Sequence, residues 1–285
     1  MKKLVIKSYA KINISLNVID KRSDGYHELD TVMLPLELHD SVIIEKFSTK
    51  GGDNFITCDD FSTGVIKYNL ATNAIIKLSE KYNFDTKFRI FIHKVIPLQA
   101  GLGGGSSNAA FTMLGINKML KLNASEEDLL AIGETIGADV PFFIKHVPAR
   151  CKGKGEIIDP ITVQNDYHVL IVMPKNGNST KEVFAVGDTL TLKTYDIEKV
   201  IHALEEGNDA LLAESIGNSL EEPAMKINPE ISEIKAKLKD FGLNLVLMSG
   251  SGASVFALST NKKELINIAK KLDNYYRVEL TKIKK

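Results

Sequence analysis

The strongest chemical signal in this sequence is a glycine- and serine-rich run at residues 97–110, PLQAGLGGGSSNAA. Glycine has no Cβ, so consecutive backbone N–H groups can curve into a concave nest that binds an anion. Helical spacing follows the run, and a helix start would add its free N–H groups and positive dipole end. The run matches neither the dinucleotide fingerprint nor a Walker A loop. It predicts a phosphate-binding loop, with a flexible connecting turn as the alternative.

Asp139 stands in an apolar stretch, GADVPFF at residues 137–143. A carboxylate in such surroundings is unexpected unless something needs it. One interpretation makes Asp139 the general base, or the orienting acceptor, for a hydroxyl that attacks a phosphoryl group. The other makes it a helix-end or turn residue that binds its own backbone amides. The residues alone leave both open.

Lys11 lies on a predicted strand, because apolar and polar residues alternate strictly over residues 10–18. One face of this strand is expected to reach a core, and the other carries Lys11 and Asn13. A lysine there could lower the pKa of a neighbouring carboxylate or stabilise developing phosphate charge. A lysine that faces solvent is the alternative.

Tyr26 and His27 follow a tight-turn signal, Asp24-Gly25. These side chains could stack on a planar ring and hydrogen-bond to it, or they could be an ordinary surface aromatic and a solvated histidine. A second small-residue loop, SGSGAS at residues 249–254, is either another backbone nest or a plain connector.

Strands and helices must position these residues. The order in which they are predicted fits an α+β protein of two halves with a cleft between them better than alternating βαβ units. A capping box at Ser125 predicts a helix start, and the segment after Gly137 is predicted to turn into an apolar strand. The remaining strands are expected at residues 31–36, 41–45, 88–92, 169–173, 244–248, 255–258 and 278–283, and the clearest further helices at 68–82, 109–120 and 262–272.

The composition is that of an ordinary globular protein, with 285 residues, 44% of them apolar and 25% charged. Lysine plus arginine equals aspartate plus glutamate at 36 each, which argues against a general nucleic-acid binder. Cys58 and Cys151 lack metal-site spacing and suit a reducing compartment. We expect neither a leader segment nor a membrane-spanning run. We therefore expect a cytoplasmic protein that binds neither nucleic acid nor membrane, as a monomer or weak homodimer.

Five motifs, taken in order along nearly the whole chain, resemble the GHMP kinase superfamily of galactokinase, homoserine kinase, mevalonate kinase and phosphomevalonate kinase. The resemblance implies a two-domain α+β fold with the active site in the cleft between the domains. Residues 1–160 would form an ATP-binding domain like the second domain of ribosomal protein S5, and residues 161–285 a C-terminal α+β domain. The motifs are AKIN at 10–13, DGYH at 24–27, GLGGGSSNAA at 101–110, GADVPFF at 137–143 and SGSGA at 249–253.

The DGYH and GADVPFF motifs are similar to one branch of the superfamily, which acts on a cytidine-diphosphate-linked methylerythritol. That branch would transfer phosphate from ATP to the 2-hydroxyl of this small molecule, in the non-mevalonate route to isoprenoid precursors. Two alternatives remain. The chain could be another GHMP kinase for a mevalonate-like or sugar alcohol, or a nucleotide-binding relative without turnover.

The resemblance also implies roles for matching residues. Asp139 and Lys11 would be catalytic, with Asp139 acting on the 2-hydroxyl and Lys11 beside it. Mg²⁺ would arrive with ATP and be held mainly by its phosphates, without a metal site of the protein's own. The substrate would be held by Asn13 at its erythritol and diphosphate, by Tyr26 and Phe184 on either side of the cytosine ring, and by His27 at the edge of that ring. ATP would be held by Lys94, Pro97, Leu98, Gln99, Ala100, Gly101, Leu102, Gly103, Gly104, Gly105, Ser106 and Ser107.

Three positions depart from the pattern of this family. Gln99 stands where glycine or alanine is common, Lys145-His146 follows where a glycine is expected, and Ser219 stands where aspartate is common. None of them removes a catalytic group.

Overall fold

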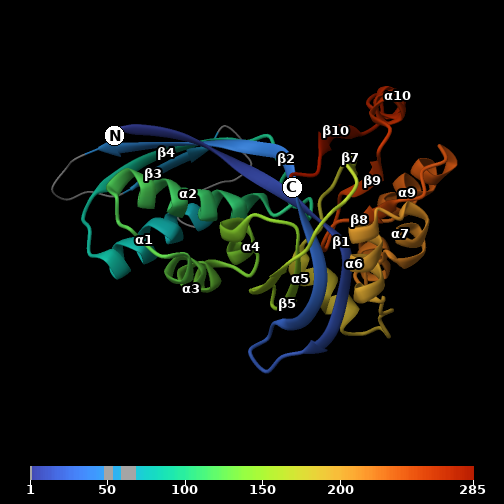
Figure 1. Cartoon of the computed structure of the whole chain (residues 1–285), viewed down its shortest axis with the longest axis horizontal. Coiled ribbons are helices and arrows are strands. Elements are labelled where there is room, and N and C mark those ends of the chain that lie inside the picture. The colour runs from blue at the N-terminus through green and yellow to red at the C-terminus, as the bar shows by residue number, and fades with distance from the viewer. Residues whose placement is uncertain (1, 48–53, 59–68) are drawn as a thin grey trace. The chain divides into compact units, whose positions relative to one another are not determined.

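The computed structural model describes residues 2–47, 54–58 and 69–285 (Figure 1). These residues form two compact units that are each built from several chain segments. Unit 1 takes the described residues of Met1–Ala10, His39–Pro97 and Gly103–His146, and unit 2 comprises Lys11–Leu38, Leu98–Leu102 and Val147–Lys285. The chain therefore passes between the units within its first two strands and within the glycine-rich loop. A domain boundary at residue 160 stays a prediction.

Unit 1 combines a sheet with helices that lie on one side of β2 and β4 (Figure 1). Strand β4 pairs with β2 in antiparallel fashion and with β3 in parallel fashion. Residues 88, 90 and 92 of β4 are buried and the residues between them are exposed, as period-two alternation predicts. The elements are β1 (Lys3–Lys21), β2 (His27–Phe47), β3 (Phe55–Cys58), α1 (Leu70–Tyr82), β4 (Lys87–His93), α2 (Gly104–Leu120), α3 (Glu126–Ile136) and α4 (Val140–Lys145), of which β1 and β2 continue into unit 2.

Unit 2 holds a four-stranded antiparallel sheet in the order β10-β7-β9-β8. Its helices cover a core that includes Leu170, Val172, Val246 and Leu265. In the same unit, β5 pairs with the first part of β2 and with β6. The elements are β5 (Ala149–Gly153), β6 (Ile157–Pro160), β7 (His168–Met173), α5 (Thr180–Gly187), α6 (Ile197–Glu206), α7 (Asp209–Ser215), α8 (Glu221–Ile227), α9 (Glu230–Asp240), β8 (Val246–Met248), β9 (Val255–Ser259), α10 (Lys262–Leu272) and β10 (Arg277–Lys282).

Most predicted elements are present, with two differences. The strands expected at 31–36 and 41–45 are parts of the single long strand β2. The apolar strand expected after Gly137 is wrong, because residues 140–145 form helix α4. Pro141 lies in the first turn of α4, where its missing N–H removes no helical hydrogen bond. A run of consecutive apolar residues fits a buried helix as well as a strand.

The helix expected at 68–82 is present from Leu70 to Tyr82, and residue 68 lies outside the described residues. None of the helices in the three described ranges is long and apolar enough to cross a bilayer.

Candidate active site

Helix α2 begins in a way that suits an anion. Its N-cap is Gly103, in the left-handed conformation with φ 71°, and it contributes no capping side chain. The first turn of α2 also lacks an acidic residue, whereas every other described helix except α4 has a capping side chain or an acidic residue there. The amides and positive dipole end of α2 are therefore available to a phosphate.

Lys94 lies at this helix start, since a Cβ added to Gly104 would be 3.2 Å from Lys94 Nζ. The ammonium donates to Asp40 Oδ2 at 2.5 Å and to Asn108 Oδ1 at 3.3 Å. Asp40 is fully buried and also accepts from the backbone N–H groups of Val95 and Ile96, both at 2.8 Å. Asp40 therefore fixes the lysine beside the phosphate loop, a role that sequence reasoning missed.

The two serines of the loop differ in their surroundings. Ser107 is fully buried, and its Oγ lies 2.7 Å from Ser8 Oγ, so its hydroxyl has a structural partner. Ser106 is half-buried, and a Cβ on Gly137 would lie 3.8 Å from its Oγ. The turn that leads to Asp139 therefore packs against the start of α2 within unit 1.

Asp139 is the last residue before α4, with helical backbone angles of φ −84° and ψ −7°. Its side chain is half-buried and makes no capping hydrogen bond to α4. A purely structural aspartate at a helix start would accept from the first amides of that helix. The geometry therefore favours a role for this carboxylate other than capping.

The unit 2 part of the glycine-rich loop rests on the second loop, residues 249–254. Ser249 Oγ donates to Gly101 O at 2.9 Å, and the amides of Ala253 and Ser254 donate to the carbonyls of Gln99 and Ala100, both at 3.2 Å. A Cβ on Gly101 would lie 2.0 Å from the Ser249 carbonyl oxygen, so only glycine fits there. The second loop therefore supports the backbone of the glycine-rich loop through these hydrogen bonds.

Two of the family departures lie at left-handed backbone positions. Gln99 has φ 51° and His146, the C-cap of α4, also has φ 51°. Glycine adopts this conformation without steric penalty, which explains the glycine expected after the Phe-Phe pair and the glycine, though not the alanine, expected at position 99. In this chain the ring of His146 stacks on Tyr9, with centroids 4.7 Å apart, and contacts Phe111 edge-on.

Lys11 and Asn13 are brought together on β1, where Lys11 Nζ donates to Asn13 Oδ1 at 2.6 Å. Both are buried, at 4% and 2% exposure, which excludes the alternative of a lysine that faces solvent. The second loop lies next to these two residues. The backbone N–H of Asn13 donates to Ser249 Oγ, and a Cβ on Gly250 would be 3.4 Å from Lys11 Nζ.

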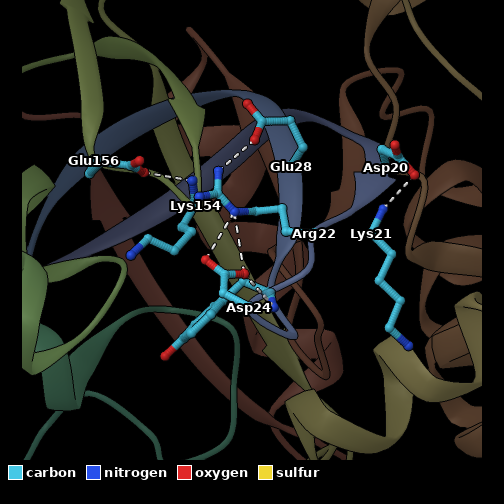
Figure 2. Close-up of polar contacts among 8 residues, drawn as sticks. Asp20, Lys21, Arg22, Asp24, Glu28, Lys154 and Glu156 are labelled. Carbon is cyan, nitrogen blue, oxygen red and sulfur yellow. Dashed lines mark hydrogen bonds and ion pairs between the residues drawn. The ribbon is translucent and has the colours of Figure 1, made fainter.

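The turn that carries Tyr26 is held by ion pairs. Figure 2 shows the Arg22 guanidinium between the carboxylates of Asp24 and Glu28. The pKa of Asp24 lies below its usual range, mainly because its carboxylate accepts from the Tyr26 N–H and also because it contacts Arg22. The Tyr26 ring is 54% exposed, and Lys154 Nζ lies 5.2 Å from its centroid. A base that stacks on Tyr26 must use the other face of the ring or displace Lys154.

His27 and Phe184 are also together in unit 2, with their rings stacked 4.6 Å apart. His27 Nε2 lies 2.7 Å from Asp188 Oδ1, and Lys21 Nζ lies 2.5 Å from Asp188 Oδ2. The contacts with Lys21 and then His27 hold the pKa of Asp188 below its usual range. Asp188 fixes the orientation of the His27 ring, and a base that stacks on Phe184 must use the face that His27 leaves open.

Comparison with known families defines the class of this fold. The family model for the GHMP kinases N terminal domain matches residues 69–146, and the model for the GHMP kinases C terminal matches residues 200–278. A crystal structure of homoserine kinase from Cytophaga hutchinsonii has the same fold, with a TM-score of 0.78 and 18% identity over 100% of this chain and 95% of that one. The fold is that of a GHMP kinase, which confirms the two-domain α+β prediction.

Curated relatives narrow the class. The 4-diphosphocytidyl-2-C-methyl-D-erythritol kinases of Geobacillus kaustophilus and Caldicellulosiruptor bescii are 38% and 37% identical, over 90% and 94% of this chain and 88% and 93% of their own lengths. A crystal structure of 4-(cytidine 5'-diphospho)-2C-methyl-D-erythritol kinase superposes with a TM-score of 0.82 at 29% identity, over 99% of this chain and all of that one. The chain belongs to this family of GHMP kinases, which are ATP-dependent phosphotransferases.

Proposed function

We propose that this protein transfers the γ-phosphoryl group of ATP to the 2-hydroxyl of 4-diphosphocytidyl-2-C-methyl-D-erythritol. The products are the 2-phosphate and ADP, in the methylerythritol phosphate route to isoprenoid precursors in the cytoplasm. The relatives support the substrate. The observation that carries the chemistry is in unit 1, where an uncapped helix start lies beside a buried lysine and against the turn that leads to Asp139.

The phosphates of ATP bind the glycine-rich loop and the start of α2, with Lys94 beside them. The positive dipole end and the N–H groups of the helix stabilise the charge on the β- and γ-phosphates. Asp40 keeps the ammonium of Lys94 in place for this contact. The second loop holds the backbone at Gly101 in place through the Ser249 hydroxyl.

Asp139 accepts the proton of the 2-hydroxyl, or orients it, while the hydroxyl oxygen attacks the γ-phosphorus and ADP leaves. A carboxylate within reach of the hydroxyl can take this role, and the half-buried Asp139 side chain does not serve as the cap of α4. Lys11 stabilises the negative charge of the transferred phosphoryl group, and Asn13 holds the erythritol and diphosphate part of the substrate.

Tyr26 and Phe184 bind the two faces of the cytosine ring, and His27 hydrogen-bonds to its edge. Asp188 forms a hydrogen bond with Nε2 of His27, so Nδ1 is the ring nitrogen left to hydrogen-bond to the base. Arg22 pairs with Asp24 and Glu28, and Asp24 accepts from the Tyr26 N–H, so the turn that carries Tyr26 is already partly ordered.

Mg²⁺ fits this site as an ion that ATP carries. Within the described ranges, His, Cys, Asp and Glu side chains do not gather in groups of three that would hold a metal. Mg²⁺ commonly keeps water and phosphate oxygens as ligands and takes one or two groups from the protein. The half-buried hydroxyl of Ser106 at the start of α2 is such a group, and the ion would neutralise phosphate charge there.

A coupled assay of ADP release tests the function. The purified protein is given ATP and Mg²⁺ with the cytidine substrate, with mevalonate or with a sugar alcohol. We expect turnover of the cytidine substrate alone. Faster turnover of another alcohol would assign the chain to a different GHMP kinase, and ATP binding without any transfer would make it a non-catalytic relative.

Tyr26→Ala should raise the KM for the cytidine substrate about tenfold, because stacking on one aromatic face contributes about 1–3 kcal/mol per base. The KM for ATP should stay unchanged, since Tyr26 belongs to the substrate side. Steady-state kinetics with each substrate varied in turn measures both values.

Tyr26→Phe is the matched control for that variant, because it keeps the ring and removes only the hydroxyl. We expect near-normal kinetics from it. An unchanged KM for the cytidine substrate in Tyr26→Ala would remove the stacking role.

A further inference from the structure

A buried chain of hydrogen bonds links Thr31 of β2 to Lys11 of β1, and all its members belong to unit 2. The Thr31 hydroxyl donates to the Ser15 carbonyl oxygen at 2.6 Å. Asn13 Nδ2 donates to Thr31 Oγ1 at 2.9 Å. Asn13 Oδ1 then accepts from Lys11 Nζ at 2.6 Å. The chain runs from a backbone carbonyl to the ammonium that we place at the transferred phosphoryl group.

The number of hydroxyl protons fixes which atom donates in each hydrogen bond of this series. A threonine hydroxyl has one hydrogen, and that of Thr31 is committed to a carbonyl oxygen, which can only accept. Thr31 Oγ1 can therefore only accept from Asn13, so the NH₂ group of the Asn13 amide must face it. The amide oxygen is consequently turned toward Lys11, where an acceptor is needed.

Burial makes this orientation matter. Thr31 is fully buried, and Asn13 and Lys11 are 2% and 4% exposed. A flipped amide would place NH₂ against the ammonium, and little water could reach the site to relieve the repulsion. The position of Lys11 Nζ thus depends on which way the Asn13 amide points.

We propose that Thr31 is a positioning residue for phosphoryl transfer: it fixes the Asn13 amide and, through it, the ammonium of Lys11. This inference rests on the proposed function of Lys11. Thr31 itself does not touch the substrate. A hydroxyl is the group that can donate to Ser15 O and accept from Asn13 at a single atom, which explains a threonine at a fully buried strand position.

The test compares Thr31→Val with Thr31→Ser. Valine has nearly the shape of threonine but neither donates nor accepts, and serine keeps the hydroxyl. We expect kcat for the cytidine substrate to fall about tenfold to a hundredfold in Thr31→Val, because loss of a buried hydrogen bond frees the amide. The KM for ATP should stay within about twofold, and Thr31→Ser should restore most of kcat.

A double-mutant cycle separates positioning from general damage. In a Lys11→Met background the ammonium is absent, so Thr31→Val should lower the residual kcat no further. A valine variant that keeps full kcat would overturn the proposal. So would an equal loss in both backgrounds, because the effect would then not pass through Lys11.

A measurement without substrate keeps the proposal independent of the assigned reaction. The rate at which an amine-reactive reagent labels Lys11 is followed by mass spectrometry of the folded protein. We expect faster labelling in Thr31→Val than in the wild type or Thr31→Ser. An unchanged rate contradicts the positioning role even if the wild type proves inactive on the cytidine substrate, which would be a failure of the proposed function instead.

Discussion

Asp139→Asn should lower kcat by about a hundredfold to ten-thousandfold, the typical effect of removing a positioned base. Asparagine has the same shape but cannot take the proton of the 2-hydroxyl. The change should leave the start of α4 intact, because the Asp139 side chain makes no capping bond to that helix. Single-turnover kinetics gives the rate of transfer, and equilibrium titration with ATP gives its affinity, which should be unchanged.

Asp196→Asn is the matched control for this variant. Asp196 caps α6 by accepting from the amide of Lys199, and asparagine caps a helix equally well. We expect full activity from it. If Asp139→Asn keeps more than about a tenth of kcat, Asp139 only orients the hydroxyl or has no part in transfer. If ATP affinity also falls, the change has disturbed the start of α2.

The elements that the sequence predicts well are those fixed by local spacing. Helix α10 matches its predicted range at 262–272, and Ser125 caps α3 as its capping box predicts, by accepting from the Asp128 amide. Both depend on residues within a few positions of one another. Helix α4 was mistaken for a strand because its short run of buried apolar residues has no periodicity to read.

The contacts that the sequence could not reveal join residues that are far apart in the chain. Thr31, Asp40 and Ser249 lie 18, 54 and 148 positions from Asn13, Lys94 and Gly101, which they contact. Such pairs follow from strand pairing and loop packing, which no motif encodes. Asp40 lies between the strands predicted at 31–36 and 41–45, where an aspartate is common in a turn, so its residue type gave no signal.

The roles of individual side chains also depend on what covers them. The alternation over residues 10–18 predicts a polar face, but period two does not say whether that face meets water or protein. The burial of Lys11 and Asn13 shows that this face meets protein. Likewise, a DGYH motif cannot show that the His27 ring stacks on Phe184.

Asp40→Ala should lower the free energy of unfolding by about 3–5 kcal/mol, the typical effect of removing one partner of a buried ion pair. The side chain of Lys94 is 7% exposed, so its charge would be left in a nearly dry site. The amides of Val95 and Ile96 would lose their acceptor as well. Urea unfolding followed by circular dichroism measures the change.

Glu80→Ala is the surface control, because the Lys77–Glu80 pair is exposed and such pairs contribute about 0–1 kcal/mol. The buried charge itself is tested with Asp40→Asn and Asp40→Asn/Lys94→Met. Asparagine keeps an oxygen for the Val95 and Ile96 amides, and methionine removes the stranded ammonium, so the double variant should be more stable than Asp40→Asn alone. A double variant that is no more stable would mean that Asp40 acts mainly through the backbone amides. Asp40→Asn, if folded, should still raise the KM for ATP, because Lys94 would no longer be held beside the start of α2.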